Sequence, residues 1–159
     1  MLLANAADAA VVRTLAVHDL NALLALYTEL HPEDPPVARD LLEQTFARML
    51  ASSFLVQMGV FAADTLVSTA QAVIVPNLTR GARPYAIIEN VGTAHAHKRR
   101  GYGALCIQAL VAHCWDAGCY KVSLTSGVSR AAEAHLFYDA LGFDRHAKTA
   151  FVLTRPGCG

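Results

Sequence analysis

Hydrophobic and polar residues follow one another in blocks along the chain, and the period within each block predicts its secondary structure. Apolar residues recur at helical spacing in segments that predict helices over residues 19–30, 37–52, 101–117 and 129–141. Shorter apolar or alternating runs predict strands over residues 11–17, 54–62, 66–75, 85–93, 120–125 and 151–154. The predicted order of elements is therefore β-α-α-β-β-β-α-β-α-β.

Residues with known turn and capping preferences mark several ends of these elements. Residues 63–65 form a turn between two strands, which predicts a hairpin. Asp19 is placed to cap the first helix, and Gly118 and Gly142 are placed to end the last two. Because hairpins and crossover helices coexist, the predicted fold class is α/β (α+β) with a mixed sheet.

Composition and charge narrow the class of protein. The 159 residues are 54% hydrophobic and 16% charged, which excludes a disordered chain and fits a single domain over residues 1–159. No apolar stretch is long enough for a membrane span, and the N-terminus lacks the basic region of a signal peptide. Because 13 basic residues balance 13 acidic ones, we expect no nucleic acid and no membrane as a partner.

The cysteines and histidines carry little evidence of metal or redox chemistry. Four irregularly spaced cysteines argue against a disulfide framework, and reduced thiols predict a cytoplasmic protein. Cys106 and Cys114 lie eight positions apart, which favours small buried side chains near one helix face. His95 and His97 form an H-x-H pattern, but two ligands do not make a zinc site, so we expect no metal.

The most informative segment is the junction of strand, turn and helix at residues 94–110, AHAHKRRGYGALCIQAL. Gly101 and Gly103 let the backbone approach a ligand closely. The first-turn amides of a helix point outward with partial positive charge, and three consecutive basic residues before the helix increase that potential. This pattern predicts a phosphate or pyrophosphate site. The alternative is a helix N-terminus with a solvated basic face. The segment matches neither a P-loop nor a dinucleotide GxGxxG turn.

Two motifs resemble one known family. Residues 98–104, KRRGYGA, resemble the (Gln/Arg)-x-x-Gly-x-(Gly/Ala) signature of the GNAT acetyltransferases, with Lys98 in place of the usual Gln or Arg. Residues 134–143, AHLFYDALGF, are similar to that family's A-x-x-Phe-Tyr-x-x-x-Gly-Phe segment. The order of elements also matches over nearly the whole chain. The resemblance implies a GNAT-like fold with a mixed, mostly antiparallel central sheet flanked by helices.

The resemblance further implies acetyl-CoA as co-substrate, without a metal. Amides and charges of the signature would hold the pyrophosphate, and the pantetheine arm would run beside the fourth strand like an added strand. An amide near Val91 or Gly92 would stabilise the oxyanion. Gly92 itself fits a bulge or a close approach, or is incidental. The residues expected to bind acetyl-CoA are Val91, Gly92, Thr93, Lys98, Arg99, Arg100, Gly101, Tyr102, Gly103, Ala104, Ser129 and Arg130. Ser129 can instead cap a helix.

Two residues are candidates for proton transfer. The resemblance places Tyr138 as the acid that protonates the departing thiolate, since a phenol with a pKa of ~10 stays protonated where a thiol at ~8.5 is ionised. Its alternative is an aromatic core residue. Glu89 lies inside an otherwise apolar strand, where a carboxylate is costly unless it serves a role. It can take the proton of the attacking amine, bind the substrate ammonium, or face outward into solvent.

The predicted function is transfer of an acetyl group from acetyl-CoA to a primary amine of a small molecule or peptide. The alternatives are a catalytically silent acyl-CoA sensor and an acyltransferase that uses another donor or acceptor. The acidic segment 31–35 suits a cationic amine and the basic segment 77–84 suits a carboxylate, so the acceptor stays open. A homodimer also stays open.

Overall fold

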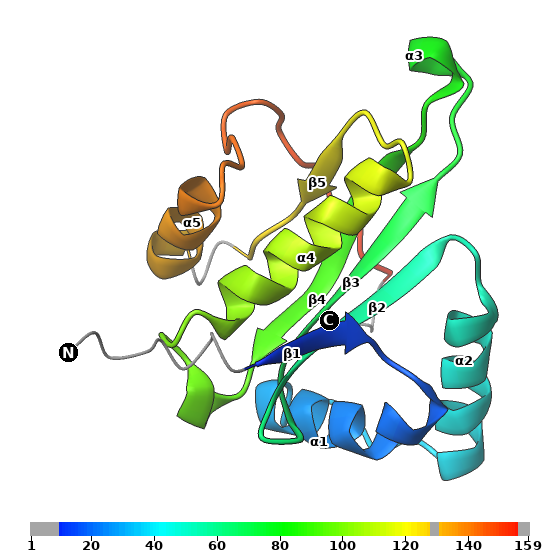
Figure 1. Cartoon of the computed structure of the whole chain (residues 1–159), viewed down its shortest axis with the longest axis vertical. Helices are drawn as coiled ribbons and strands as arrows, with labels where there is room; N and C mark the ends of the chain where they lie inside the picture. The colour runs from blue at the N-terminus through cyan, green and yellow to red at the C-terminus, as the bar shows by residue number, and fades with distance from the viewer. Residues whose placement is uncertain (1–9, 128–130, 156–159) are drawn as a thin grey trace. The chain divides into compact units, whose positions relative to one another are not determined.

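The computed structural model describes residues 10–127 and 131–155. Two compact units make up the chain, residues 1–124 and 125–159. The single domain expected over residues 1–159 therefore stays a prediction. The first unit holds a five-stranded sheet in the order β1-β2-β3-β4-β5 (Figure 1).

The sheet is mixed and mostly antiparallel, which confirms the expected fold class. Its strands are β1 (Val11–Thr14), β2 (Leu55–Ala62), β3 (Thr65–Val75), β4 (Tyr85–Thr93) and β5 (Val122–Leu124). Neighbours from β1 to β4 pair antiparallel, and β5 pairs parallel to β4. The hairpin between β2 and β3 turns at Ala63 and Asp64, whose φ angles of 46° and 64° match the two left-handed positions of a type I′ turn.

The helices agree with the predicted ranges to within two residues at each end. They are α1 (Leu20–Leu30), α2 (Arg39–Ala51), α3 (Thr79–Ala82), α4 (Tyr102–Asp116) and α5 (Ala131–Ala140), with short 3-10 helices η2 (Val17–Asp19) and η3 (His95–His97). The additional short element, α3, lies in the loop expected at residues 77–84. It is a turn rather than a regular helix, because Arg80 and Gly81 inside it are left-handed.

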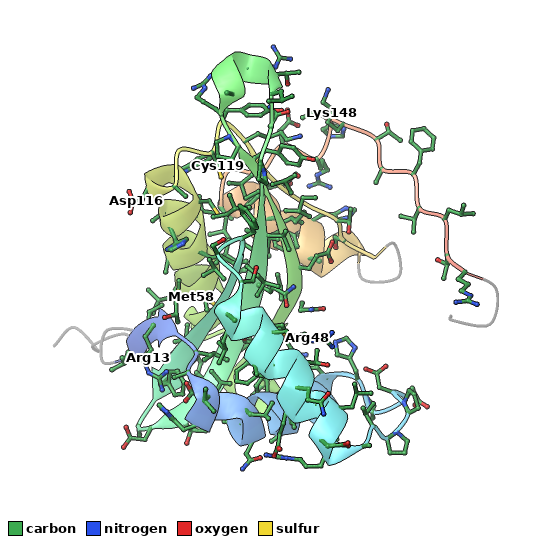
Figure 2. The ribbon with its side chains drawn as sticks, turned by 90° about the vertical axis from the view of Figure 1, so that its right-hand side faces the viewer. Arg13, Arg48, Met58, Asp116, Cys119 and Lys148 are labelled. Carbon is green, nitrogen blue, oxygen red and sulfur yellow. The ribbon has the colours of Figure 1, made fainter. Side chains whose placement is uncertain are left out.

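Helices cover both faces of the sheet in the first unit. One face packs against α1 and α2 around a buried cluster of Leu15, Leu20, Leu23, Leu26, Phe46, Phe61 and Leu66. The opposite face packs against α4, whose Cys106, Ile107, Leu110 and Cys114 are fully buried. Figure 2 shows Asp116 of α4 and Arg48 of α2 on different sides of the sheet. Side chains alternate along a strand, so each β-residue belongs to one of these two layers.

Asp19 stands at the start of α1, but its carboxylate does not cap that helix. It accepts hydrogen bonds from the Arg13 guanidinium at 2.6 and 2.8 Å and from the Ala16 N–H at 2.7 Å. The hydrogen bonds from Arg13 lower the pKa of this buried carboxyl to about 2, against the opposing effect of burial. Asp19 therefore ties β1 to the beginning of α1.

The helices α4 and α5 both end in a Schellman motif. Gly118 (φ 79°) and Gly142 (φ 88°) are left-handed, which confirms them as the expected C-terminal caps. The Cys119 N–H donates to the Cys114 carbonyl at 3.1 Å, and the Gly118 N–H donates to the Trp115 carbonyl at 2.9 Å. The motif places two buried cysteines against the end of α4 as its apolar contact.

The strand expected at residues 151–154 is wrong. These residues have no regular secondary structure, and Phe151, Val152 and Leu153 are 93%, 79% and 99% exposed. An apolar run of β-branched and aromatic residues fits a strand only where another strand pairs with it.

Candidate active site

The edge of β4 that faces β5 is only partly paired. Parallel pairing with β5 joins Ala86 to Val122 and ends where Ile88 meets Leu124, although β4 continues to Thr93. Among the described residues, no strand pairs with residues 89–93 on that side. A bulge begins directly after the paired part, because Asn90 has a φ of 52° and the register against β3 shifts there. The strand therefore presents an open backbone edge.

The register against β3 decides which backbone groups point to this open edge. The Ala94 N–H donates to the Val67 carbonyl of β3 at 2.9 Å, and hydrogen-bonded pairs alternate along an antiparallel ladder. Thr93, opposite Ser68, therefore turns its N–H and C=O away from β3, and so does Val91 two residues before it. Gly92 instead faces β3 with its backbone.

Gly92 has a packing reason of its own. A Cβ at this position would lie 2.1 Å from Leu30 Cδ1 of α1, far inside van der Waals contact. The backbone bulge lies at Asn90 rather than at the glycine. A bulge or a close approach was expected at Gly92. The close approach is present, and it is made by Leu30 of helix α1. Whether a bound ligand also needs this glycine stays a prediction.

The turn from β4 into α4 brings positive charge and helix amides together. Arg99 (φ 59°) and Gly101 (φ 85°) are left-handed, and the Gly101 carbonyl accepts the first helical hydrogen bond from Leu105 at 3.0 Å. The amides of Gly103 and Ala104 precede that bond, so the helix offers them no acceptor. The side chains at positions 98–100 and the backbone of Gly101 are exposed. This geometry suits a doubly charged phosphate group.

Tyr102 takes a different part in this turn. Its ring is 4% exposed and lies 5.9 Å from the His97 ring, measured between centroids. The side chain thus packs under the turn, and the CoA-binding role expected for Tyr102, which its backbone amide would fill, stays a prediction.

Helix α1 is also tied to the turn. The Glu29 carboxylate accepts a hydrogen bond from the His95 N–H at the start of η3, and its Oε1 lies 3.3 Å from His95 Nδ1. A carboxylate at a helix N-terminus satisfies a backbone donor and complements its partial charge. Glu29 therefore positions the segment that leads into the basic turn.

Glu89 lies at the open edge, next to the bulge. Its side chain is exposed, so the expected cost of a buried carboxylate does not arise and that expectation is wrong. It makes no hydrogen bond or ion pair to another described residue, and its backbone partner across β3 is Gln71. The carboxylate is therefore available to an amine from solvent, while its role stays a prediction.

Three polar side chains cross the face that carries α1, in a row that the sequence analysis missed. Gln57 of β2 lies opposite Gln71 of β3, and Gln71 lies opposite Glu89 of β4. Their Cβ atoms are therefore expected about 4.5–5.5 Å apart from strand to strand. We call Gln57, Gln71 and Glu89 the polar row. The signal that could have found it is a single glutamine in each of two largely buried strands.

Tyr138 belongs to the second unit, near the end of α5. Its ring lies 6.0 Å from Phe143, edge to face, and its carbonyl accepts the Phe143 N–H at 3.1 Å. Together with left-handed Gly142, these contacts form the Schellman motif of α5. The Phe-Tyr-x-x-x-Gly-Phe segment thus has a structural role in ending α5. The acid role of Tyr138 stays a prediction. Ser129 and Arg130 lie outside the described residues.

Within residues 10–127 and 131–155, no three His, Cys, Asp or Glu side chains gather as a metal site. No helix of the same residues is both long and apolar enough to cross a membrane. Burial raises the pKa of the Cys106 thiol to about 12 and that of Cys114 to about 11. These thiols are poor nucleophiles. The candidate functional groups of this site are therefore the backbone amides, the basic turn and the polar row.

Comparison with known proteins decides the family. The acetyltransferase (GNAT) family matches residues 20–143, which include both motifs, the open edge of β4 and the basic turn. The chain belongs to the GNAT acetyltransferase family. A protein of Agrobacterium tumefaciens assigned as an acetyltransferase has a solved structure similar to this GNAT protein. The TM-score is 0.86, with 40% identity over 91% of this chain and 99% of the other.

Two further relatives have named activities. The glucosamine 6-phosphate N-acetyltransferase of Trypanosoma brucei brucei is 34% identical over 83 residues, 52% of this chain. The match spans 54% of that relative, about half of its length. An aminoglycoside N-acetyltransferase solved with CoA shares the GNAT fold, with a TM-score of 0.76 and 19% identity over 92% of this chain and 95% of its own.

Proposed function

We propose that this GNAT protein transfers the acetyl group of acetyl-CoA to a primary amine of a small molecule or peptide. The observation that carries the proposal is the open edge of β4 leading directly into a basic turn and the N-terminus of α4. An extended amide-containing arm and a pyrophosphate joined in one molecule are complementary to that sequence of features. CoA bound in a GNAT relative and the acetyl acceptor of the Trypanosoma enzyme support it.

The backbone at the open edge would bind the donor. Val91 and Thr93 offer N–H and C=O groups that an amide-containing arm can meet as a neighbouring strand would. The N–H of Val91 is the candidate to stabilise the oxyanion of the tetrahedral intermediate. The pyrophosphate would lie on the amides of Gly101, Tyr102, Gly103 and Ala104, with charge from Lys98, Arg99 and Arg100.

Proton transfer would involve two side chains. An amine must lose a proton to attack the acetyl carbon, and Glu89 can take it directly or through water. Collapse of the tetrahedral intermediate breaks the bond from carbon to sulfur and expels the CoA thiolate. Tyr138 is the candidate to protonate that thiolate, with water as the alternative. Ser129 and Arg130 stay predicted CoA contacts, and the cytoplasmic location and a homodimer also stay predictions.

Gly103→Glu tests the donor site, because a carboxylate would occupy the space and repel the pyrophosphate. We expect no CoA binding by calorimetry, whereas Gly81→Glu in the remote β3–β4 loop should bind CoA normally. Equal affinity in the Gly103 variant would reject the assignment.

Thiol release from acetyl-CoA, measured with a panel of primary amines, tests the reaction. Glu89→Gln should lower turnover by ~10²–10⁴ with CoA affinity unchanged. Tyr138→Phe, which keeps the ring packing on Phe143, should lower it towards the smaller end of that range. CoA binding without thiol release for any amine would instead identify a silent acyl-CoA sensor.

A further inference from the structure

The polar row carries an inference about the acceptor, which rests on the proposed function. Its three members differ in access to solvent, because Gln57 is 3% exposed, Gln71 is half-buried and Glu89 is exposed. The row thus leads from the open edge of β4 inward under α1. A ligand whose amine lies at Glu89 would extend over Gln71 toward Gln57.

Hydrogen bonds around the buried end fix the orientation of Gln57. Thr69 Oγ1 donates its proton to the Met58 carbonyl at 2.8 Å, so it can only accept from Gln57 Nε2, 2.8 Å away. The same Nε2 donates to the Tyr27 hydroxyl at 3.3 Å. The amide oxygen of Gln57 is buried and has no partner among the described residues. Buried amide oxygens are almost always hydrogen-bonded, so this one signals a missing partner.

The same network leaves donors near the row. The Tyr27 hydroxyl accepts from Gln57, so its own proton remains for another acceptor. Gln71 Oε1 accepts from the Asn90 amide at 3.4 Å, which directs the two N–H groups of Gln71 elsewhere. The row therefore combines one carboxylate, for an ammonium, with neutral donors and one buried acceptor, for groups that both give and take hydrogen bonds.

The two register steps that flank the polar row on the sheet add mostly apolar side chains and no charged one. One register step from the polar row, Leu55, Val73 and Ile87 lie opposite one another across the same three strands, all half-buried. The step on the other side is Gly59, Thr69 and Gly92, where Leu15 and Leu30 approach. A carboxylate or phosphate at this place would find no cation in the row. A carbon skeleton with hydroxyl groups would find both apolar contact and hydrogen-bond partners.

We infer that the polar row and Tyr27 bind the acceptor, and that the acceptor is an amine with a hydroxyl group on a neighbouring carbon. The ammonium would pair with Glu89 before it loses its proton. The hydroxyl oxygen would accept from Gln71 or Tyr27, and its proton is suited to the unpartnered oxygen of Gln57. Gln71 and Tyr27 would therefore determine specificity rather than take part in proton transfer.

The test compares two amines that differ by one hydroxyl, trans-2-aminocyclohexanol and cyclohexylamine. For the unmodified protein we expect a kcat/KM about tenfold higher for the aminoalcohol, the worth of a net hydrogen bond of ordinary strength. Tyr27→Phe and Gln71→Leu should bring this ratio close to one. Their KM for acetyl-CoA should remain within about twofold, because neither side chain lies at the donor site.

Matched controls separate specificity from a general loss of structure. Tyr85→Phe removes a hydroxyl at the far end of β4, where Tyr85 packs against Tyr120, and Gln108→Leu removes an exposed amide on α4. Both should keep the preference for the aminoalcohol. Thermal melting of the Tyr27 and Gln71 variants verifies that they fold.

A second readout makes failure of this inference distinct from failure of the proposed function. Calorimetry with CoA-loaded protein measures binding of the two amines without turnover. If both amines are acetylated at equal rates, or if the two variants keep the preference, the inference is overturned and acetyl transfer stands. If no thiol is released but binding favours the aminoalcohol and Tyr27→Phe removes the preference, the row is confirmed as a binding site. In that case acetyl transfer to this class of amine is rejected.

Discussion

Replacing Gly92 by alanine tests why a glycine lies directly before the last residue of β4. The new Cβ would lie 2.1 Å from Leu30 Cδ1 but 3.6 and 4.0 Å from the next two atoms of that leucine. A single methyl group must therefore move. A displaced rotamer costs about 0.5–1.5 kcal/mol, and overpacking of a core costs about 1–3 kcal/mol. We expect a loss of about 1–3 kcal/mol in the free energy of unfolding, equivalent to a fall in Tm of about 2–12 °C at this chain length.

The same substitution in a Leu30→Ala background should have the opposite sign. The clashing methyl is then absent, and alanine in a strand is more favourable than glycine by about 0.5–1 kcal/mol. A double-mutant cycle by urea unfolding measures this coupling. An equal loss of stability in both backgrounds would refute the contact with Leu30 as the cause. CoA affinity of the double variant then tells whether a bound ligand also requires the glycine.

Three further predictions concern contacts outside the reacting groups. Because the pKa of Asp19 is lowered from 3.8 to about 2, its stabilisation is complete above pH ~4 and is lost as the pH falls towards 2. Asp19→Asn should cost about 2 kcal/mol at pH 7 and flatten stability between pH 2 and 4 in urea titrations; an unchanged pH profile would contradict this. Gly142→Ala should cost about 1 kcal/mol and Gly142→Asn less, by thermal melting, because a left-handed residue is needed there. Glu29→Ala should weaken CoA binding about fivefold in calorimetry, since His95 loses its acceptor, whereas Glu33→Ala should leave it unchanged.

Most of the fold could be predicted from the sequence, because the apolar residues that recur at helical or strand spacing lie on the buried faces of their elements. The period of residues 102–116 places Cys106 and Cys114 on the buried face of α4, as expected. Turns were predictable where residue type and backbone agree, as at Asp64 and Gly118. The segment 151–154 has the composition of a strand, but pairing depends on a neighbour that local composition does not specify.

The part of the site that consists of backbone groups within one sequence motif could be predicted. The part that depends on the register between strands could not. The basic turn carries its signal in consecutive residues. The polar row is created by pairing of residues that are far apart in the sequence, so no local window reveals Gln57 and Gln71 beside Glu89. Glu89 was expected to be costly to bury, but it is exposed beside the bulge at Asn90. Asparagine tolerates a left-handed backbone, which was the available signal for that bulge.

The bulge at Asn90 is not required for the pairing of β4 with β3, but it determines the shape of the open edge. On β4 two residues, Asn90 and Val91, stand opposite the single residue Ala70 of β3. A chain shorter by that one asparagine could keep the pairs on both sides, with each flanking side chain on its present face. It would lose only the local bend that a bulge imposes. The geometry of the edge is therefore encoded by the number of residues in β4, and single-residue deletion rather than substitution is the change to which it is most sensitive.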